Sequence, residues 1–539
     1  MTSTHVLADR RHLWIFVSGC LAVTLGVLLH LPMFWMGRGD GFRLADMPMD
    51  TPMRVGMGLI VAGIVAAGFG LVPRAQPVPG PLPRDLRIVA PEDAPLGWAH
   101  WRLMLVLTVA LVIDVMKPAS LGFVVPGMTQ EYAVPKTTIA WLPFAALCGT
   151  VVGSVLWGWL ADLYGRRASI LLSAVMFVGT SICGAMPSLW WNVGMCFLMG
   201  AAAGGMLPVA YALLVETMPS RHRGWVLVLV GGVGAVGGYL AASGCAAWLE
   251  PVFSWRILWF LNLPTGLALI FLNAFIPESP KFLLRLGRLV EMRETLRGFG
   301  CVVRAEGADP NGHVGLAGDD RRARVNPAPR VLPGLIGSTW ALSIAAFAWG
   351  LVNFGLLLWM PANLVAKGYS MRLSSELLAA SALIALPTVF IAALLYSRWS
   401  SKGSLLGAIV LMAAGLVGVV YLELAKPGSA NPVWSFALLI VGINGIIAML
   451  LPYAAESYPH GVRGRATGWV AACTKGGGLA AQLLSLLGLV PTLLVAGLAI
   501  LVPVLLALLL VARFCVETRG LDLRDLEDDG GLGEPLASA

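Results

Sequence analysis

Long apolar runs dominate this chain. Fourteen stretches of roughly 20 predominantly apolar residues follow one another, separated mostly by short polar connections. Only 12% of the 539 residues are charged, whereas a soluble chain has about 25%. Because each run is long enough to cross a bilayer as a helix, the sequence predicts an all-α membrane protein. The expected spans are residues 12–36, 54–73, 99–124, 138–161, 168–187, 191–216, 224–248, 256–276, 335–358, 376–397, 404–424, 433–452, 465–488 and 490–513.

Lys and Arg residues are distributed unevenly over the connections. With both termini cytoplasmic, 26 of the 37 Lys and Arg residues fall in inner segments and seven in outer loops. Inner loops of membrane proteins carry such an excess. We therefore expect a multi-pass protein of the cell inner membrane with both termini cytoplasmic. The net charge of +8 follows from this distribution and does not indicate nucleic-acid binding.

One long polar segment, residues 277–334, divides twelve of the expected helices into two groups of six. Within it, residues 280–297 have apolar residues at helical spacing and are expected to form short surface helices. Residues 307–333 are rich in Gly, Pro, Asp and Arg and are expected to be flexible. The expected parts are a two-helix extension with its linker (1–98), a first six-helix bundle (99–276), the central loop (277–334), a second six-helix bundle (335–513) and a cytoplasmic tail (514–539).

Two segments that lie 240 residues apart resemble each other. Residues 216–224 read ETMPSRHRG and residues 456–464 read ESYPHGVRG, so Glu, Pro, Arg and Gly recur at the same spacing. Each segment follows a long apolar run at an equivalent point of its half. Such duplication indicates a transporter whose two halves move against each other around a central site.

Further motifs accompany this repeat. Residues 158–167 read GWLADLYGRR, residues 277–283 read PESPKFL and residues 517–520 read ETRG. Together these motifs, spread over residues 99–525, resemble those of the major facilitator superfamily, in particular its sugar-porter and metabolite–proton symporter branches. The resemblance implies two six-helix bundles, here with two extra N-terminal helices, and secondary transport by alternating access.

The charged residues of these motifs stand beside expected helix ends on the cytoplasmic side. We expect them to form a charge lattice that closes this side of the carrier and breaks when it opens. Alternatively, they are solvated charges that each contribute little. Residues 396–402 (YSRWSSK) have Ser where the first half has Asp, so the lattice is expected to be asymmetric. The expected gating residues are Asp162, Arg166, Arg167, Glu216, Arg223, Glu456 and Arg463.

Three charged residues lie near the middle of expected spans, where a charge in hydrocarbon costs about 3 kcal/mol. Asp114 and Lys117 are three residues apart on one helix, so they could neutralise each other. Lys475 has no acidic residue within a helical turn. An anionic substrate would supply the missing partner, so Lys475 is the stronger indication of a polar cavity.

Symporters of the resembled family often carry Asp-x-x-Asp in this helix, and here Asp114 keeps the first position while Lys117 replaces the second. Their Arg position before Gly200 is Cys196. The surplus of positive charge favours a carboxylate substrate, with Asp114 as the proton-coupling residue. We expect proton-coupled uptake of a small organic anion. The expected substrate-binding residues are Lys117, Lys475, Asn353, Asn444, Gln482 and Trp349, and for the last four ordinary helix packing is an equal alternative.

Other functions stay open. Efflux of a drug or metabolite by antiport would use the same architecture. A sugar substrate fits the surplus of positive charge within the spans less well. A transporter-like nutrient sensor could signal through residues 74–98. The pattern GVGAVG at 232–237 lies within a span and is interpreted as helix packing, not as a dinucleotide site. The eight cysteines lack metal-binding or disulfide spacing. We expect no enzymatic activity, no cofactor, no metal, and a monomer.

Overall fold

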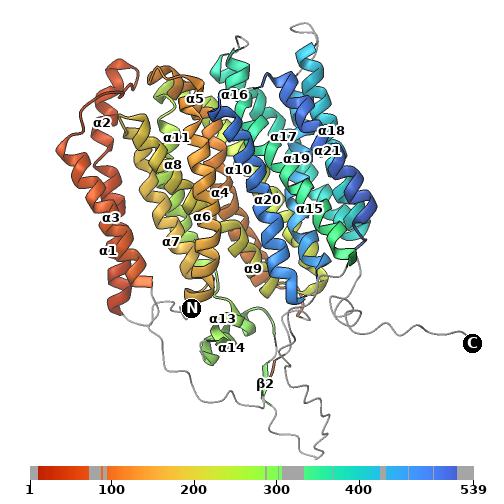
Figure 1. Cartoon of the computed structure of the whole chain (residues 1–539). Coiled ribbons are helices and arrows are strands. Elements are labelled where there is room, and N and C mark those ends of the chain that lie inside the picture. Colours follow the sequence, from red (N-terminus) through yellow and green to blue (C-terminus); the bar gives the residue numbers. More distant parts are fainter. Residues whose placement is uncertain are drawn as a thin grey trace, which may run out of the picture.

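The computed structural model describes residues 10–71, 86–88, 94–285, 288–301, 303–305, 333–366, 368, 370–424, 432–458, 460–489 and 491–518. Most of this part of the chain forms long helices that run side by side (Figure 1). Among the described residues, twelve helical segments are long and apolar enough to cross a membrane. Large apolar side chains, such as Val61, Val155 and Leu509, are exposed on the outside, where lipid would cover them.

The N-terminal extension is a helical hairpin at the edge of the molecule. Its helices α1 (Arg10–Leu28) and α3 (Thr51–Leu71) are joined by α2 (Leu31–Met36) and η1 (Gly37–Asp40). Glycines let the two long helices approach closely, since a Cβ added to Gly19 would lie 2.6 Å from the Ala67 nitrogen. The hairpin packs against α7 of the first bundle, on the side away from the second bundle (Figure 1).

The first bundle differs from the expectation in one span. Residues 191–216, expected as one helix, form α8 and α9 with a break at Gly204 and Gly205. Added Cβ atoms there would overlap the Thr150 carbonyl oxygen and the Trp157 side chain, so both glycines permit close contact with α6. The elements are α4 (Trp98–Glu131), α5 (Lys136–Ile139), α6 (Trp141–Tyr164), α7 (Arg166–Gly179), η3 (Thr180–Ala185), α8 (Leu189–Ala203), α9 (Met206–Thr217), α10 (Ser220–Phe253), α11 (Ile257–Phe260), α12 (Asn262–Leu272) and η4 (Asn273–Phe275).

The second bundle also contains one helix outside the twelve apolar spans. This is α20, which carries Lys475 and Gln482 and, with 27 residues, extends about 40 Å, enough to cross a bilayer. The expected total of about fourteen therefore consists of the twelve apolar spans, the α8–α9 pair and α20. The elements are α15 (Pro333–Leu351), the π-helical turn η5 (Val352–Leu356), α16 (Leu357–Ala366), α17 (Met371–Arg398), α18 (Ser401–Leu424), α19 (Pro432–Ser457), α20 (His460–Leu486) and α21 (Leu493–Phe514).

The central loop lies at one end of the bundles. It contains α13 (Pro280–Arg285) and α14 (Leu289–Gly298), as expected for residues 280–297. Strand β2 (Val303–Ala305) pairs antiparallel with β1 (Leu86–Ile88) of the linker. Helix α1 begins and α21 ends at this same end, which we call the loop end (Figure 1). Residues 307–332, expected to be flexible, fall outside the described residues.

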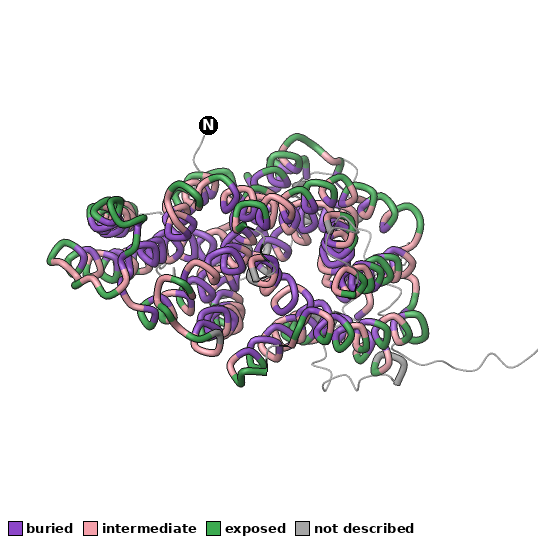
Figure 2. Tube along the Cα trace, turned by 90° about the horizontal axis from the view of Figure 1, so that it is seen from above, coloured by how far each residue is buried: buried purple, intermediate pink, exposed green. Residues whose placement is uncertain are grey.

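The two bundles meet along a few helices. Helix α10 packs against α17 and α19, α4 against α16, and α6 against α20. In the view from above, buried residues fill the inside of the molecule and exposed residues line its perimeter (Figure 2). These four contacts form the interface between the two bundles.

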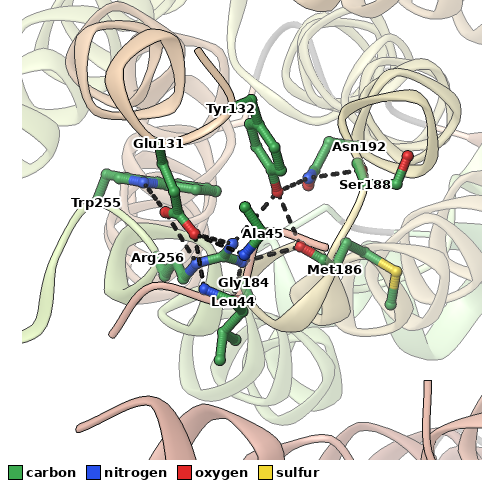
Figure 3. A network of polar contacts seen from close by, with 10 residues as sticks. All are labelled: Leu44, Ala45, Glu131, Tyr132, Gly184, Met186, Ser188, Asn192, Trp255 and Arg256. Carbon is green, nitrogen blue, oxygen red and sulfur yellow. Dashed lines mark hydrogen bonds and ion pairs between the residues drawn. The ribbon is translucent and has the colours of Figure 1, made fainter. Parts of the chain in front are cut away.

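A buried polar network holds the extension against the first bundle at the end opposite the loop end (Figure 3). The Glu131 carboxylate is its centre and accepts hydrogen bonds from the backbone N–H groups of Leu44 (2.7 Å) and Ala45 (3.1 Å). The fully buried Arg256 pairs with Glu131 at 2.6 Å. Trp255 Nε1 donates to the same carboxylate at 2.9 Å. Arg256 also donates to two carbonyl oxygens, those of Gly184 and Met186.

We expect the variant Arg256→Met to unfold at a markedly lower temperature. It leaves Glu131 buried without its cation, and removing one partner of a buried ion pair costs about 3–5 kcal/mol. Thermal unfolding of the purified protein in detergent measures this loss. The control Arg372→Met removes a pair with Glu376 that is 66% and 43% exposed, which contributes less than about 1 kcal/mol. Equal unfolding temperatures for the two variants would contradict the stabilising role of the network.

Candidate functional site

A cavity of about 410 Å³ lies between the two bundles. The first bundle contributes residues of α4, α6, α9 and α10, and the second bundle residues of α15, η5, α16, α19 and α20. Most of the lining is apolar. Among the described residues that line the cavity, Asp114 and Lys475 are the only charged ones. One carboxyl group on one bundle thus shares an apolar chamber with one ammonium group on the other.

The two charged residues of α4 have different surroundings. Asp114 lines the cavity, whereas Lys117, although also buried, does not. Residues three apart on an α-helix lie about 60° apart around its axis, on the same face. The two side chains nevertheless reach different surroundings here. The Lys117 ammonium lies over the ring of the buried Phe177 in α7. A cation–π contact therefore supports its charge. Lys117, expected as a substrate-binding residue, is thus not among the residues that line this cavity.

Lys475 presents its ammonium to the cavity from α20. Its Nζ lies 5.0 Å from the centroid of the Phe354 ring, which also lines the cavity. Within the described part of the chain, no carboxylate oxygen lies within 4.0 Å of this nitrogen. Lys475 interacts electrostatically with Asp114 without touching it. The cavity therefore contains an ammonium group that is accessible to an anion.

Glycines allow the part of α20 that carries Lys475 to lie close to α15 and η5. A Cβ at Gly477 would overlap the carbonyl oxygen of Phe347 in α15, and one at Gly478 would lie 2.8 Å from Cβ of Phe354. Helix α20 can pack this tightly because its residues have no side chain at these points. The close contacts at Gly477 and Gly478 thus help to place Lys475 at the cavity wall.

The π-helical turn η5 shapes the same wall. It carries Asn353 and Phe354, and π turns often occur at functional sites because they interrupt the regular hydrogen-bond ladder. The fully buried Gln482 donates a hydrogen bond of 2.5 Å from Nε2 to the Phe354 carbonyl oxygen. Gln482 is absent from the cavity lining. Its amide therefore supports the turn, and its expected role in substrate binding stays a prediction.

Three of the expected polar and aromatic residues do line the cavity: Trp349, Asn353 and Asn444. Trp349 Nε1 donates to the Ile443 carbonyl oxygen at 2.9 Å, and Asn444 Nδ2 donates to that of Ile440 at 2.8 Å. The face of the Trp349 indole and the amide oxygen of Asn444 therefore remain available to a ligand. Asn353 has no hydrogen-bond partner among the described residues, so its whole amide group is available.

Two tyrosines of the first bundle also face the cavity, although the sequence pattern did not single them out. Tyr211 of α9 and Tyr239 of α10 both line the cavity. The Tyr239 hydroxyl is buried and has no hydrogen-bond partner among the described residues. A Cβ at Gly231 would overlap the Tyr211 hydroxyl, so this glycine makes room for the side chain. Only nine tyrosines occur in the chain. The position of Tyr239 within a long apolar run, directly after two glycines, was the sequence feature that could have indicated a cavity residue.

At the loop end, the motif residues of the first half form a network around two carboxylates. Glu278 Oε1 accepts a hydrogen bond of 2.8 Å from the backbone N–H of Arg166, at the start of α7. Burial raises the pKa of Glu278. Arg166 Nη2 lies 3.2 Å from Glu216, which also accepts a hydrogen bond from the Ser279 hydroxyl. Arg167 interacts electrostatically with Glu278.

The second half repeats this arrangement with hydroxyl groups. Glu517 Oε1 accepts a hydrogen bond of 2.8 Å from the backbone N–H of Ser401, at the start of α18. Thr518 Oγ1 donates to Glu456 Oε2 at 2.9 Å. Tyr396 donates to the same oxygen at 2.7 Å, where the first half has an arginine. The two networks thus share a plan but differ in charge.

The loop-end networks lie next to the contact between the bundles. Arg223 of α10 interacts electrostatically with Glu456 of α19. A Cβ at Gly224 would lie 3.5 Å from Glu456 Oε1, so the two helix ends are close. Five of the seven expected gating residues therefore take part in these networks. The side chains of the other two, Asp162 and Arg463, lie outside the described part of the structure.

The profile of the Major Facilitator Superfamily matches residues 103–482 of this chain. The chain belongs to the major facilitator superfamily. The expected family is thereby confirmed, and the protein is a multi-pass membrane transporter. Its structure resembles that of XylE, a proton:xylose symporter from E. coli, with a TM-score of 0.62 and 16% identity over 80% of this chain and 99% of that one. This likeness establishes the fold.

Relatives of this carrier include transporters named for small aromatic molecules. The niacin transporter NiaP of Acinetobacter baylyi is 27% identical over 409 residues, which cover 73% of the carrier and 88% of NiaP. The 4-hydroxybenzoate transporter PcaK of the same species is 30% identical over 203 residues, which cover 36% of the carrier and 43% of PcaK.

Proposed function

We propose that this carrier takes up a small aromatic carboxylate together with protons by alternating access. The observation that carries the proposal is the Lys475 ammonium, which faces the cavity with no carboxylate oxygen of the described residues within 4.0 Å. A substrate carboxylate would pair with it through charge-assisted hydrogen bonds. The names of NiaP and PcaK support an aromatic acid such as nicotinate or 4-hydroxybenzoate.

The cavity walls suit a planar ring. Phe123, Tyr211, Tyr239, Trp349 and Phe354 line the cavity from both bundles, and aromatic faces bury ring surface with favourable geometry. In this proposal the ring lies among these side chains. The free amide of Asn353 and the unpartnered Tyr239 hydroxyl then bind polar substituents of the ring.

Asp114 provides a route to proton coupling. Its negative charge attracts Lys475 and repels a substrate anion that binds there. A proton on Asp114 removes this competition, so the anion binds more tightly. By thermodynamic linkage, a bound anion favours the protonated carboxyl to the same extent. The proton and the substrate anion therefore bind together, as symport requires.

Lys117 has a different proposed role from Lys475. It interacts electrostatically with Asp114 from outside the cavity. We assign it the role of stabilising the negative charge of Asp114 when the cavity is empty, so that this carboxylate releases its proton. The networks around Glu216 and Glu456 at the loop end then close the cytoplasmic side while the cavity faces outward.

Uptake into proteoliposomes tests the proposal. The purified carrier is reconstituted, and labelled nicotinate, 4-hydroxybenzoate and xylose are supplied outside with the interior made alkaline. We expect accumulation of one or both acids, no accumulation of xylose, and loss of accumulation with a protonophore. Protein-free liposomes correct for diffusion of the neutral acids. Uptake of both acids no greater than in protein-free liposomes would refute the proposed substrate class, and preloaded vesicles reveal the reverse direction.

A further inference from the structure

A second cavity lies at the end of the molecule opposite the loop end. Its volume is about 310 Å³. Three parts of the chain line it: Arg43 from the connection of the extension, Glu250 from the last turn of α10, and Arg372 from the first turn of α17. The extension, the first bundle and the second bundle therefore all contribute a charged side chain to one space.

The charged groups of this cavity are not paired with one another. Glu131 also lines it but is occupied by Arg256, Trp255 and two backbone N–H groups. Oε2 of Glu250 is buried, and no described residue donates a hydrogen bond to it. Arg43 forms no ion pair with a described carboxylate. A buried carboxylate oxygen without a partner is costly, which indicates a missing donor.

Arg372 is available to a ligand as well. Its Nε bonds to Glu376 at 2.8 Å, but the two side chains are 66% and 43% exposed, and such pairs contribute little and exchange readily. Arg372 also lies in the first turn of α17, a helix of 28 residues, whose positive dipole end favours an anion. Arg43 and Arg372 thus offer two guanidinium groups for a carboxylate.

The buried network explains the position of Arg43. Glu131 binds the backbone N–H groups of Leu44 and Ala45, the two residues that follow Arg43. The extension is thereby held with Arg43 at the rim of the cavity. Because α10 and α17 belong to different bundles, the site is complete only when the bundles stand as they do here.

We propose that this cavity is an entrance site for an organic anion that also carries a hydrogen-bond donor. The carboxylate binds Arg43 and Arg372, and a hydroxyl on the far side of the ring donates to Glu250. The inference rests on the proposed function and extends it, because it makes the N-terminal extension part of substrate selection among hydroxylated and unsubstituted aromatic acids.

Transport kinetics in proteoliposomes, with 4-hydroxybenzoate and benzoate as the two substrates, test this site. Arg43→Gln is expected to raise KM about tenfold for both acids, the effect of losing one charge-assisted contact. Glu250→Gln is expected to raise KM about fivefold for the hydroxylated acid and to leave KM for benzoate unchanged, since only the former has a donor. Glu250→Asp is expected to restore part of the preference. Arg38→Gln, in the same connection but outside the cavity lining, serves as the control.

A purely structural pair between Arg43 and Glu250 would give a different pattern. Arg43→Gln and Glu250→Gln would then each raise KM equally for the two acids, and the variant with both substitutions would have no higher KM than either single variant. The unfolding temperatures of these variants would also fall. This pattern overturns the inference. It is also overturned if neither variant alters KM while the wild type transports both acids, and the proposed function then still stands. A wild type that transports neither acid overturns both.

Discussion

Lys475→Met should abolish high-affinity binding of the aromatic carboxylate while the carrier still folds. The ammonium is the only cation among the described residues that line the central cavity. A hydrogen bond to a charged group contributes about 1.5–3 kcal/mol, so its loss weakens binding roughly 10- to 150-fold. Isothermal titration of the detergent-purified protein with nicotinate and 4-hydroxybenzoate measures the change directly.

Two neighbouring variants make this result specific. Lys475→Arg keeps the positive charge and should retain part of the affinity. Thr474→Val alters the adjacent cavity residue, whose hydroxyl already donates to the Ala471 carbonyl oxygen, and should change affinity less than about threefold. If Lys475→Met binds the acids as tightly as Thr474→Val does, the carboxylate does not pair with this lysine.

Asp114→Asn should separate binding from proton coupling. The neutral amide mimics a permanently protonated carboxyl group, so it no longer competes with the substrate for Lys475. Substrate affinity should equal or exceed that of the wild type and lose its pH dependence. Exchange of labelled for unlabelled acid across the membrane should continue. Accumulation driven by an inside-alkaline pH gradient should fall to the level of protein-free liposomes.

Asp114→Glu is the matched control because it keeps a titratable carboxyl group at the cavity wall. It should accumulate substrate under the same gradient, although more slowly. The coupling role would be refuted if Asp114→Asn still concentrated the acid as the pH gradient increased. Loss of both exchange and binding in this variant would show that the carboxyl group is needed for the substrate itself.

Much of the fold could be predicted from the order of apolar and polar residues. A helix that spans a bilayer needs about 20 apolar residues, and the chain repeats this unit with short connections. The break between α8 and α9 was missed because Gly204 and Gly205 are tolerated within apolar runs. They end the helix here because α6 lies against them, which depends on packing.

The candidate site could be predicted in part. Asp114 and Lys475 were found because a charge within an apolar run is costly unless a cavity or a partner receives it. Asn353, Asn444 and Trp349 also reached the cavity lining. For Gln482, the local sequence looked the same, yet its amide supports η5. Polarity within a span predicts burial with a partner but does not say whether that partner is protein or ligand.

The amino-acid sequence by itself determined that this chain is a membrane-embedded helical carrier with two related halves, because hydrophobic length, charge asymmetry and repeated motifs are local properties. Tertiary structure alone decided which of two mid-span lysines faces the cavity. Lys117 lies against Phe177 and Lys475 beside Phe354, and this depends on how each helix is rotated against its neighbours. It also brought Arg43, Glu250 and Arg372 to one cavity, since contacts between residues hundreds of positions apart exist only once the helices have packed.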